Sequence, residues 1–297
     1  MYQALRSYMD EMGKSQSALA RALGVSKATL NLYLQNKYVG DVNALNDKVR
    51  AFLDLAKKRV DTAKLHIEFV ETNTAKQMLS FLGMTHVLGQ LGIMYGDAGM
   101  GKTTCLKAYQ RANSACVLIE PDTTFTAKVL LQELCRVLRL PEKGNMHDLM
   151  ARVVDCLKDS ERLIMVDEAE LLPLRALETL RRVHDKAGCA VVLAGMPKLL
   201  LNLKGPNAEF KQLFGRVSMH LNLGDRVALD DLKQIACEIL GIHDERALES
   251  LANKANGSVR KMQKLMENVY YLMRVNGIGL DELDEAFIER AESFLIH

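Results

Sequence analysis

Short apolar runs alternate with amphipathic segments between residues 63 and 223. The apolar runs are nearly continuous and lie at 91–95, 115–121, 162–168, 190–195 and 218–223. Two intervening segments, 125–140 and 146–159, repeat their apolar residues at helical spacing. Strands of a parallel sheet are buried on both faces and therefore read as continuous apolar runs, with helices between them. The pattern predicts an α/β domain with a parallel sheet at 63–224.

The two ends of the chain carry a different pattern, with helical periodicity and no convincing strand. Residues 1–62 read as short helices closed by a longer helical stretch, and residues 225–297 read as a further all-α unit. Three domains are therefore expected, with boundaries near residues 62 and 224.

The segment 16–35 has the pattern of a helix-turn-helix. Its apolar positions face inward at Leu19, Ala20 and Leu23, and Gly24 makes the turn before a second helix. Ser26 is a natural N-cap for that second helix, which leaves three polar side chains for phosphates and base edges: Lys27, Thr29 and Asn31. We expect residues 1–62 to be a DNA-binding domain. A helix-turn-helix that serves protein contacts alone is the alternative.

The composition of the chain favours a soluble globular protein over a membrane or secreted one. Hydrophobic residues make up 48% and charged residues 26%, which is the balance of a soluble globular protein. No apolar run reaches membrane-spanning length, and the first residues do not read as a secretion signal. The six cysteines are scattered, so we expect buried, reduced thiols in a cytoplasmic protein and no metal held by cysteine.

The net charge of +2 hides an asymmetry along the chain. Residues 1–60 hold ten Lys and Arg against five Asp and Glu, whereas residues 225–297 hold nine against fourteen. The basic head favours nucleic acid, to which it adds a sequence-independent attraction. The acidic end is a possible docking surface for another partner.

A glycine-rich loop follows the apolar run at 91–95 and carries the sharpest motif of the chain. "GDAGMGKT" fits G-x-x-x-x-G-K-[ST], and a helix is expected to begin near Lys102. Glycines let backbone N–H groups surround phosphate oxygens, and the helix directs its positive end at them. Lys102 would reach the β- and γ-phosphates and Thr103 would ligate Mg²⁺. The expected ATP-binding loop comprises Gly96, Asp97, Ala98, Gly99, Met100, Gly101, Lys102, Thr103 and Thr104.

A second acidic motif ends the apolar run at 162–168. Asp167 and Glu168 follow four apolar residues, which puts both carboxylates at the carboxyl edge of a parallel strand, where ligands bind in open α/β sheets. Asp167 would hold Mg²⁺ through water, and Glu168 would orient and deprotonate the attacking water. Together the two motifs predict ATP hydrolysis.

The order of phosphate loop, acidic strand and trailing helices resembles the AAA+ ATPases. The resemblance implies that residues 225–297 form a lid and that the lid contributes an arginine, for which Arg260 in "GSVRKM" is the candidate. It also implies an arginine that reaches the nucleotide of a neighbouring subunit. Arg216 in "LFGRV" is the candidate, with Arg181 and Arg182 as competitors. The family places a polar residue at the tip of the strand at 190–195, but this chain has Gly195 and Met196 there.

The whole chain, in domain order, resembles the B transposition proteins of Mu-like phages. The resemblance implies an ATPase in the cytoplasm of a bacterial host that self-associates into an ATP-dependent oligomer or helical filament on double-stranded DNA, with low sequence specificity. It also implies delivery of that DNA to a transposase. Candidate DNA contacts of the central domain are Lys128, Arg136, Arg139 and Arg152.

Two other functions remain open at this stage. One is a helix-turn-helix transcription regulator that uses its ATPase as a switch and dimerises on a palindromic site. The other is an ATPase similar to helicase loaders, whose main partner is a helicase ring. Filaments on random-sequence DNA would favour the transposition protein over both.

Overall fold

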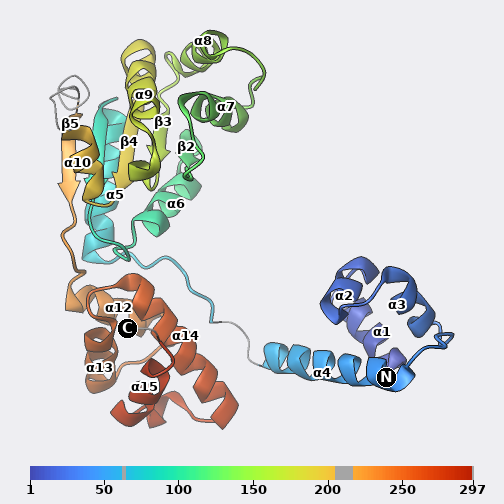
Figure 1. The fold of residues 1–297 in the computed structure, drawn as a ribbon. Coiled ribbons are helices and arrows are strands. Elements are labelled where there is room, and N and C mark those ends of the chain that lie inside the picture. Colours follow the sequence, from blue (N-terminus) through green and yellow to red (C-terminus); the bar gives the residue numbers. More distant parts are fainter. Residues whose placement is uncertain (62–64, 205–216, 296–297) are drawn as a thin grey trace. The chain divides into compact units, whose positions relative to one another are not determined.

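A computed structural model describes residues 1–61, 65–204 and 217–295 (Figure 1). The contacts within the chain define two compact units, and each is described by itself. The first holds Met1–Leu65 and the short segment Tyr271–Ile278; the second holds His66–Tyr270 and Gly279–His297. The boundary predicted near residue 62 lies next to residues 62–64, outside the described part of the chain.

The N-terminal unit is helical, with α1 (Tyr2–Glu11), α2 (Gln16–Leu23), α3 (Lys27–Leu34) and α4 (Val42–Asp61). Its core contains the apolar positions expected from the sequence, including Leu19, Ala20 and Leu23. Gly24 ends α2 in the left-handed conformation that glycine adopts without strain. The Ser26 side chain then accepts a hydrogen bond from the Thr29 N–H, which caps the start of α3.

Five parallel strands form the central sheet, in the order β2-β3-β4-β1-β5. They are β1 (Leu91–Tyr95), β2 (Cys116–Ile119), β3 (Leu163–Val166), β4 (Ala190–Gly195) and β5 (Val217–Asn222). All residues of β3 and β4 are buried, whereas β5 alternates between half-buried and exposed positions. This difference fits central strands that are covered on both faces beside an edge strand. The predicted parallel α/β sheet is confirmed.

Helices cover both faces of the sheet (Figure 1). One face packs against α5 (Asn73–Val87) and α6 (Lys102–Ala112), through a core that includes Met78, Leu106 and Met165. The other face packs against α7 (Ala127–Val137), α8 (Met146–Leu157) and α9 (Leu174–Ala187). Successive strand residues alternate between these two cores, as the side chains of a pleated sheet must.

The C-terminal part of the second unit is helical. It contains α12 (Leu229–Leu240), α13 (Glu245–Ala255), η2 (Leu280–Glu282) and α15 (Glu285–Glu292). It also contains α14 (Val259–Asn276) as far as Tyr270, because the last residues of this helix belong to the first unit. Two short elements of the sheet domain complete the described structure, η1 (Ala169–Leu171) and α10 (Lys198–Lys204). In the residues that the structure describes, no helix is both long and apolar enough to cross a membrane.

One buried carboxylate joins the sheet domain to the C-terminal helices. Asp231, in the first turn of α12, is 1% exposed. Its two oxygens accept hydrogen bonds from the N–H groups of Asn73 and Thr74, at 3.0 and 2.9 Å. These N–H groups lie in the first turn of α5 and lack helical partners, so a residue distant in sequence caps this helix.

Candidate ATP-binding site

The phosphate loop lies between β1 and α6, as the sequence predicts. Gly99 and Gly101 have φ angles of +86° and +88°, a left-handed region that strains other residues. The Asp97 N–H donates to the Gly224 carbonyl at 3.0 Å, which holds the start of the loop against the segment after β5. Because Gly101 is the N-cap of α6, the free N–H groups of that helix face the loop.

Lys102 is the first residue of α6 and its side chain folds back over the loop. Its ammonium group donates hydrogen bonds to the carbonyl oxygens of Gly96 at 2.6 Å and Asp97 at 2.9 Å. The residue is only 9% exposed. Burial lowers the pKa of this ammonium, and the negative charges of Glu170 and Asp167 act against that shift. The structure therefore holds a buried cation at the mouth of the loop.

Thr103 and Asp167 bring the two sequence motifs together. The Thr103 hydroxyl donates a 2.5 Å hydrogen bond to Oδ2 of Asp167. Asp167 follows β3 directly and is 3% exposed, and its Oδ1 accepts from the Glu168 N–H at 3.0 Å. A hydroxyl and a carboxylate at this separation are the hard oxygen donors that Mg²⁺ prefers, so the residues present fit this ion.

Glu168 lies in the turn between β3 and η1. Its φ angle of +44° is left-handed, which costs a side-chain-bearing residue energy and is typical of functional positions. The side chain is exposed and lines the same cavity as Lys102, Thr103 and Asp167. The turn therefore directs a solvated carboxylate to the rim of the phosphate site.

The cavity around these residues has a volume of about 460 Å³. Its walls come from the phosphate loop, the segment after β3, the tip of β4 and the start of α14. Arg260, the second residue of α14, is exposed and lines the cavity. The Val259 N–H donates to the Gly99 carbonyl at 2.8 Å, which fixes α14 against the loop. The predicted lid arginine thus lies in the same cavity as Lys102.

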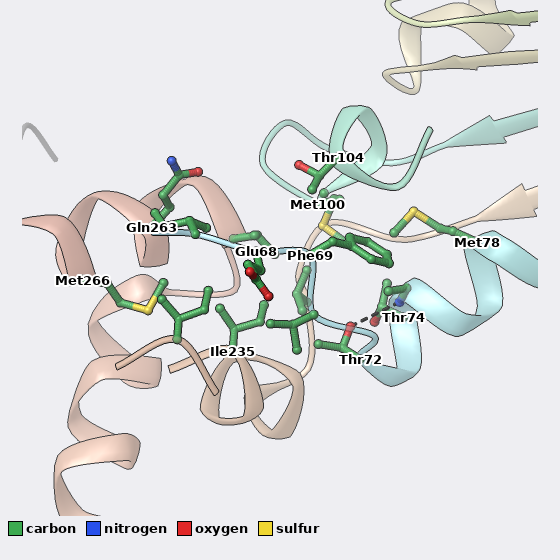
Figure 2. Close-up of a pocket in the computed structure, with 17 residues that line it drawn as sticks. Glu68, Phe69, Thr72, Thr74, Met78, Met100, Thr104, Ile235, Gln263 and Met266 are labelled. Carbon is green, nitrogen blue, oxygen red and sulfur yellow. Dashed lines mark hydrogen bonds between the residues drawn. The ribbon is translucent and has the colours of Figure 1, made fainter. Parts of the chain in front are cut away.

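A second, largely apolar pocket lies beside the phosphate cavity (Figure 2). Figure 2 shows side chains around it from the stretch before α5, from α5 itself, from the phosphate loop and the start of α6, and from α12 and α14. The two cavities share five lining residues, which are Met100, Gly101, Thr104, Val259 and Gln263. An apolar pocket that continues into an anion-binding loop can hold a flat aromatic base.

The stretch before α5 contributes to this pocket, although no site residue is predicted there. Phe69 is half-buried and Val70 is 9% exposed, and both line the apolar pocket. The run "HIEFV" carries a local signal, because apolar residues at 67, 69 and 70 are unusual in a solvated linker.

The sequence offers three candidates for the arginine that reaches the nucleotide of a neighbouring subunit. Arg216 lies outside the described residues. Arg181 is 12% exposed at its side chain, where its guanidinium binds Glu178 and Asp185 of its own helix α9. Arg182 also contacts Glu178, at 3.2 Å. The guanidinium groups of these two competitors are therefore already engaged within α9.

The three side chains predicted to contact DNA lie in α3 of the N-terminal unit. Lys27 and Asn31 are exposed. Thr29 is half-buried, and its hydroxyl lies 2.9 Å from the Ser26 hydroxyl, so it takes part in the helix cap. Thr29 is thus less available to a ligand than the sequence suggests.

Comparison with known proteins identifies the family to which the chain belongs. A family model described as an AAA domain matches residues 87–203. The Mu-like prophage FluMu DNA transposition protein B of Haemophilus influenzae is 30% identical over 258 residues, which cover 82% of this chain and 87% of that protein. The chain belongs to the family of Mu-like transposition proteins B. The ATP-dependent target DNA activator B of Escherichia phage Mu is 26% identical, across 97% of this chain and 92% of that protein.

Solved structures agree with the fold of this family member. The Aeropyrum pernix ORC2 protein has a TM-score of 0.58 at 18% identity, with coverage of 80% of this chain and 71% of that one. The Thermotoga maritima RuvB branch migration motor has a TM-score of 0.52 at 17% identity, with coverage of 75% and 68%. The transposition protein B family member described here is therefore an AAA ATPase that binds ATP.

Proposed function

We propose that the protein is an ATP-dependent DNA-binding ATPase that oligomerises on target DNA and delivers it to a transposase. One observation carries the proposal. Lys102, Thr103 and Asp167 meet in one cavity, in a chain that is similar over 97% of its length to a protein named ATP-dependent target DNA activator B.

The proposed roles of the site residues follow from their positions. Backbone N–H groups of the loop and the Lys102 ammonium bind the β- and γ-phosphates. To reach them, the Lys102 ammonium gives up its hydrogen bonds to the Gly96 and Asp97 carbonyls and bonds to phosphate oxygens instead. The apolar pocket takes the adenine ring. Thr103 and Asp167 hold Mg²⁺, which, when bound, neutralises charge on the phosphates. Glu168 takes the proton of the attacking water, and Arg260 stabilises the terminal phosphate from the lid.

Nucleotide-dependent assembly would couple this site to DNA. We propose that Arg216 of one protomer reaches the triphosphate bound by the next, so that ATP favours the assembled state through its higher affinity for it. Assembly then aligns many weak basic contacts along one duplex, and their combined avidity gives stable coating with low sequence specificity. Hydrolysis would release the DNA.

Two surfaces supply basic residues for DNA. The first is the N-terminal unit, where the basic Lys27 and the polar Asn31 are exposed on α3. The second is a broad groove between α7, α8 and α9, with a volume of about 1020 Å³. Four basic side chains line it, Lys128, Arg175, Arg182 and Lys186, against the single acidic side chain of Glu178 among its lining residues. The charge of the groove suits a polyanion.

Two of the other central-domain candidates have partners on their own surface. Arg136 binds the Glu133 carboxylate, and Arg152 donates to the carbonyl oxygens of Pro141 and Lys143. Arg139 is exposed, with a left-handed φ of +59°. Lys128 is the one member of this set that lines the groove, so it is the preferred DNA contact.

Electron microscopy of the protein with random-sequence duplex and ATP tests the proposal directly. Continuous filaments that form with ATP and disappear with the Lys102→Ala variant are the expected result. Isolated dimers on one palindromic site would instead indicate a transcription regulator, and a requirement for a helicase ring would indicate a loader. Unimpaired coating of DNA by Lys102→Ala would contradict the coupling between nucleotide and DNA.

A further inference from the structure

Glu170 is a carboxylate in the phosphate cavity that the motifs do not account for. It lies in η1, two residues beyond Glu168, and lines the cavity with Lys102 and Asp167. Its Oε2 atom is buried and has no hydrogen-bond partner among the described residues. Buried polar atoms normally have such a partner, because an unpaired one costs about 1–3 kcal/mol. The described part of the protein therefore provides no donor for this oxygen.

The Glu170 carboxylate packs against the glycine at the tip of β4. A Cβ atom at Gly195 would lie 2.1 Å from Oε2 of Glu170, far inside contact distance. The backbone of Glu170 is held as well, since the Asn202 amide donates to its carbonyl oxygen at 3.2 Å. Glu170 thus fills the place at the strand tip where the sequence lacks a polar side chain.

The surrounding charges support a functional role for this placement. Burial lowers the pKa of the Lys102 ammonium, and among the carboxylates that oppose this shift Glu170 acts most strongly. Both side chains line one cavity, so the carboxylate faces the same space as the cation expected to bind the terminal phosphates. A carboxylate only accepts hydrogen bonds, so it would repel phosphate oxygens and attract a water molecule.

We propose that Glu170 is a second catalytic carboxylate, which accepts a hydrogen bond from the attacking water and so replaces the polar residue absent from the tip of β4. The water carries two protons. Glu168 takes one of them as the oxygen–phosphorus bond forms and the bond to the ADP leaving group breaks. Glu170 accepts a hydrogen bond from the other, which directs a lone pair of the oxygen at the γ-phosphorus.

The inference rests on the proposed role of Glu168, and steady-state kinetics with a separate binding assay tests it. Glu170→Ala is expected to lower kcat by about tenfold or more, because it removes an interaction made with the reacting water. The Kd for a non-hydrolysable ATP analogue should stay within about threefold of the parent value. Glu170→Gln keeps an oxygen acceptor and should retain more activity than Glu170→Ala.

Gly195→Ala offers an independent route to the same effect. The added methyl group would displace the Glu170 carboxylate, so kcat should fall as it does in Glu170→Ala while the Kd is kept. Gly83→Ala is the matched control, because a Cβ at this glycine of α5 would meet nothing nearer than the Tyr109 hydroxyl at 3.9 Å. Glu142→Gln controls for loss of an exposed carboxylate outside the cavity.

Two results would overturn the proposal. One is a Glu170→Ala variant with kcat within about twofold of the parent. The other is a loss of analogue affinity that matches the loss in kcat, which would indicate a structural role for η1. Glu168→Gln, measured beside these variants, tests the base assignment separately: normal turnover by Glu168→Gln would disprove the role of Glu168 whatever Glu170→Ala does.

Discussion

The Thr103 hydroxyl donates a 2.5 Å hydrogen bond to Asp167 across 64 residues of sequence. The bond joins the first turn of α6 to the end of β3, so the protein itself brings the two motifs together in one site. Preorganised oxygen donors bind a metal ion with less reorganisation than donors that must first be brought together. The pair is therefore the natural target for testing the metal part of the site.

Thr103→Val should weaken the dependence of ATP binding on Mg²⁺. The substitution keeps the size and branching of the side chain but removes the oxygen donor, so the gain in ATP affinity on adding Mg²⁺ should fall by about 10- to 100-fold. Thr103→Ser restores the hydroxyl and should behave as the parent does. Titration of a fluorescent ATP analogue with and without Mg²⁺ measures both. An equal Mg²⁺ response in the valine and serine variants would remove Thr103 from the metal site.

Glu168→Gln should separate nucleotide binding from hydrolysis. The amide cannot accept the proton of the attacking water, so kcat should fall by about 10²- to 10⁴-fold. Affinity for ATP should be retained, because Lys102 and the loop are unchanged. The same variant should remain on DNA longer after ATP is added, as measured by filter binding. Rapid release of this variant from DNA would show that ATP hydrolysis does not control how long the protein stays bound.

Local patterns predicted much of the fold. The strand limits at 91–95 and 190–195 agree with β1 and β4 to the residue, because continuous apolar runs bounded by glycine are distinct from helical spacing. The phosphate loop is equally local: its glycines, lysine and threonine are adjacent in sequence and act together in space.

Features that depend on contacts between distant segments could not be predicted from the sequence. Asp231 caps α5 from about 157 residues away, and the pairing leaves no periodic signal. Glu170 looks like one more acidic residue in "DEAE" until the structure places it against Gly195. The apolar pocket likewise forms only when the stretch before α5 meets α12 and α14. For Arg181 the sequence suggested a role that the structure does not favour. This candidate for the neighbouring subunit's nucleotide forms ion pairs with Glu178 and Asp185 of its own helix, which stabilise that helix.

Removing the charge of Lys128 and Lys186 should reduce DNA affinity and its dependence on salt. Each phosphate contact that is lost lowers the slope of log K against log salt by about one. Lys128→Ala with Lys186→Ala should therefore lower it by up to about two, equally for all DNA sequences. Lys158→Ala removes an exposed lysine outside the groove and is the control. An unchanged slope in the double variant would exclude the groove as a DNA surface.

Three buried cysteines should react with thiol reagents only after the protein opens. Burial raises the pKa of Cys105 to about 12 and those of Cys116 and Cys189 to about 11, from an ordinary value of 9.0. Their thiolates are therefore scarce in the folded protein at pH 8. Stability should also fall as pH rises from about 9 towards these values, because the unfolded state loses protons that the folded state keeps. Thiol titration with and without urea measures the first effect, and urea denaturation at pH 8 and 10 the second.

Asp231→Ala should destabilise the junction between α5 and α12. The carboxylate is 1% exposed and accepts hydrogen bonds from two N–H groups of the first turn of α5, so its removal leaves two partly buried donors unpaired. A loss of about 2–3 kcal/mol in the free energy of unfolding is expected. Asp230→Ala is the matched control, since Asp230 precedes it in the same helical turn and is exposed. Urea denaturation followed by circular dichroism compares the two; equal stability would mean that water replaces the carboxylate and that the cap adds nothing to the fold.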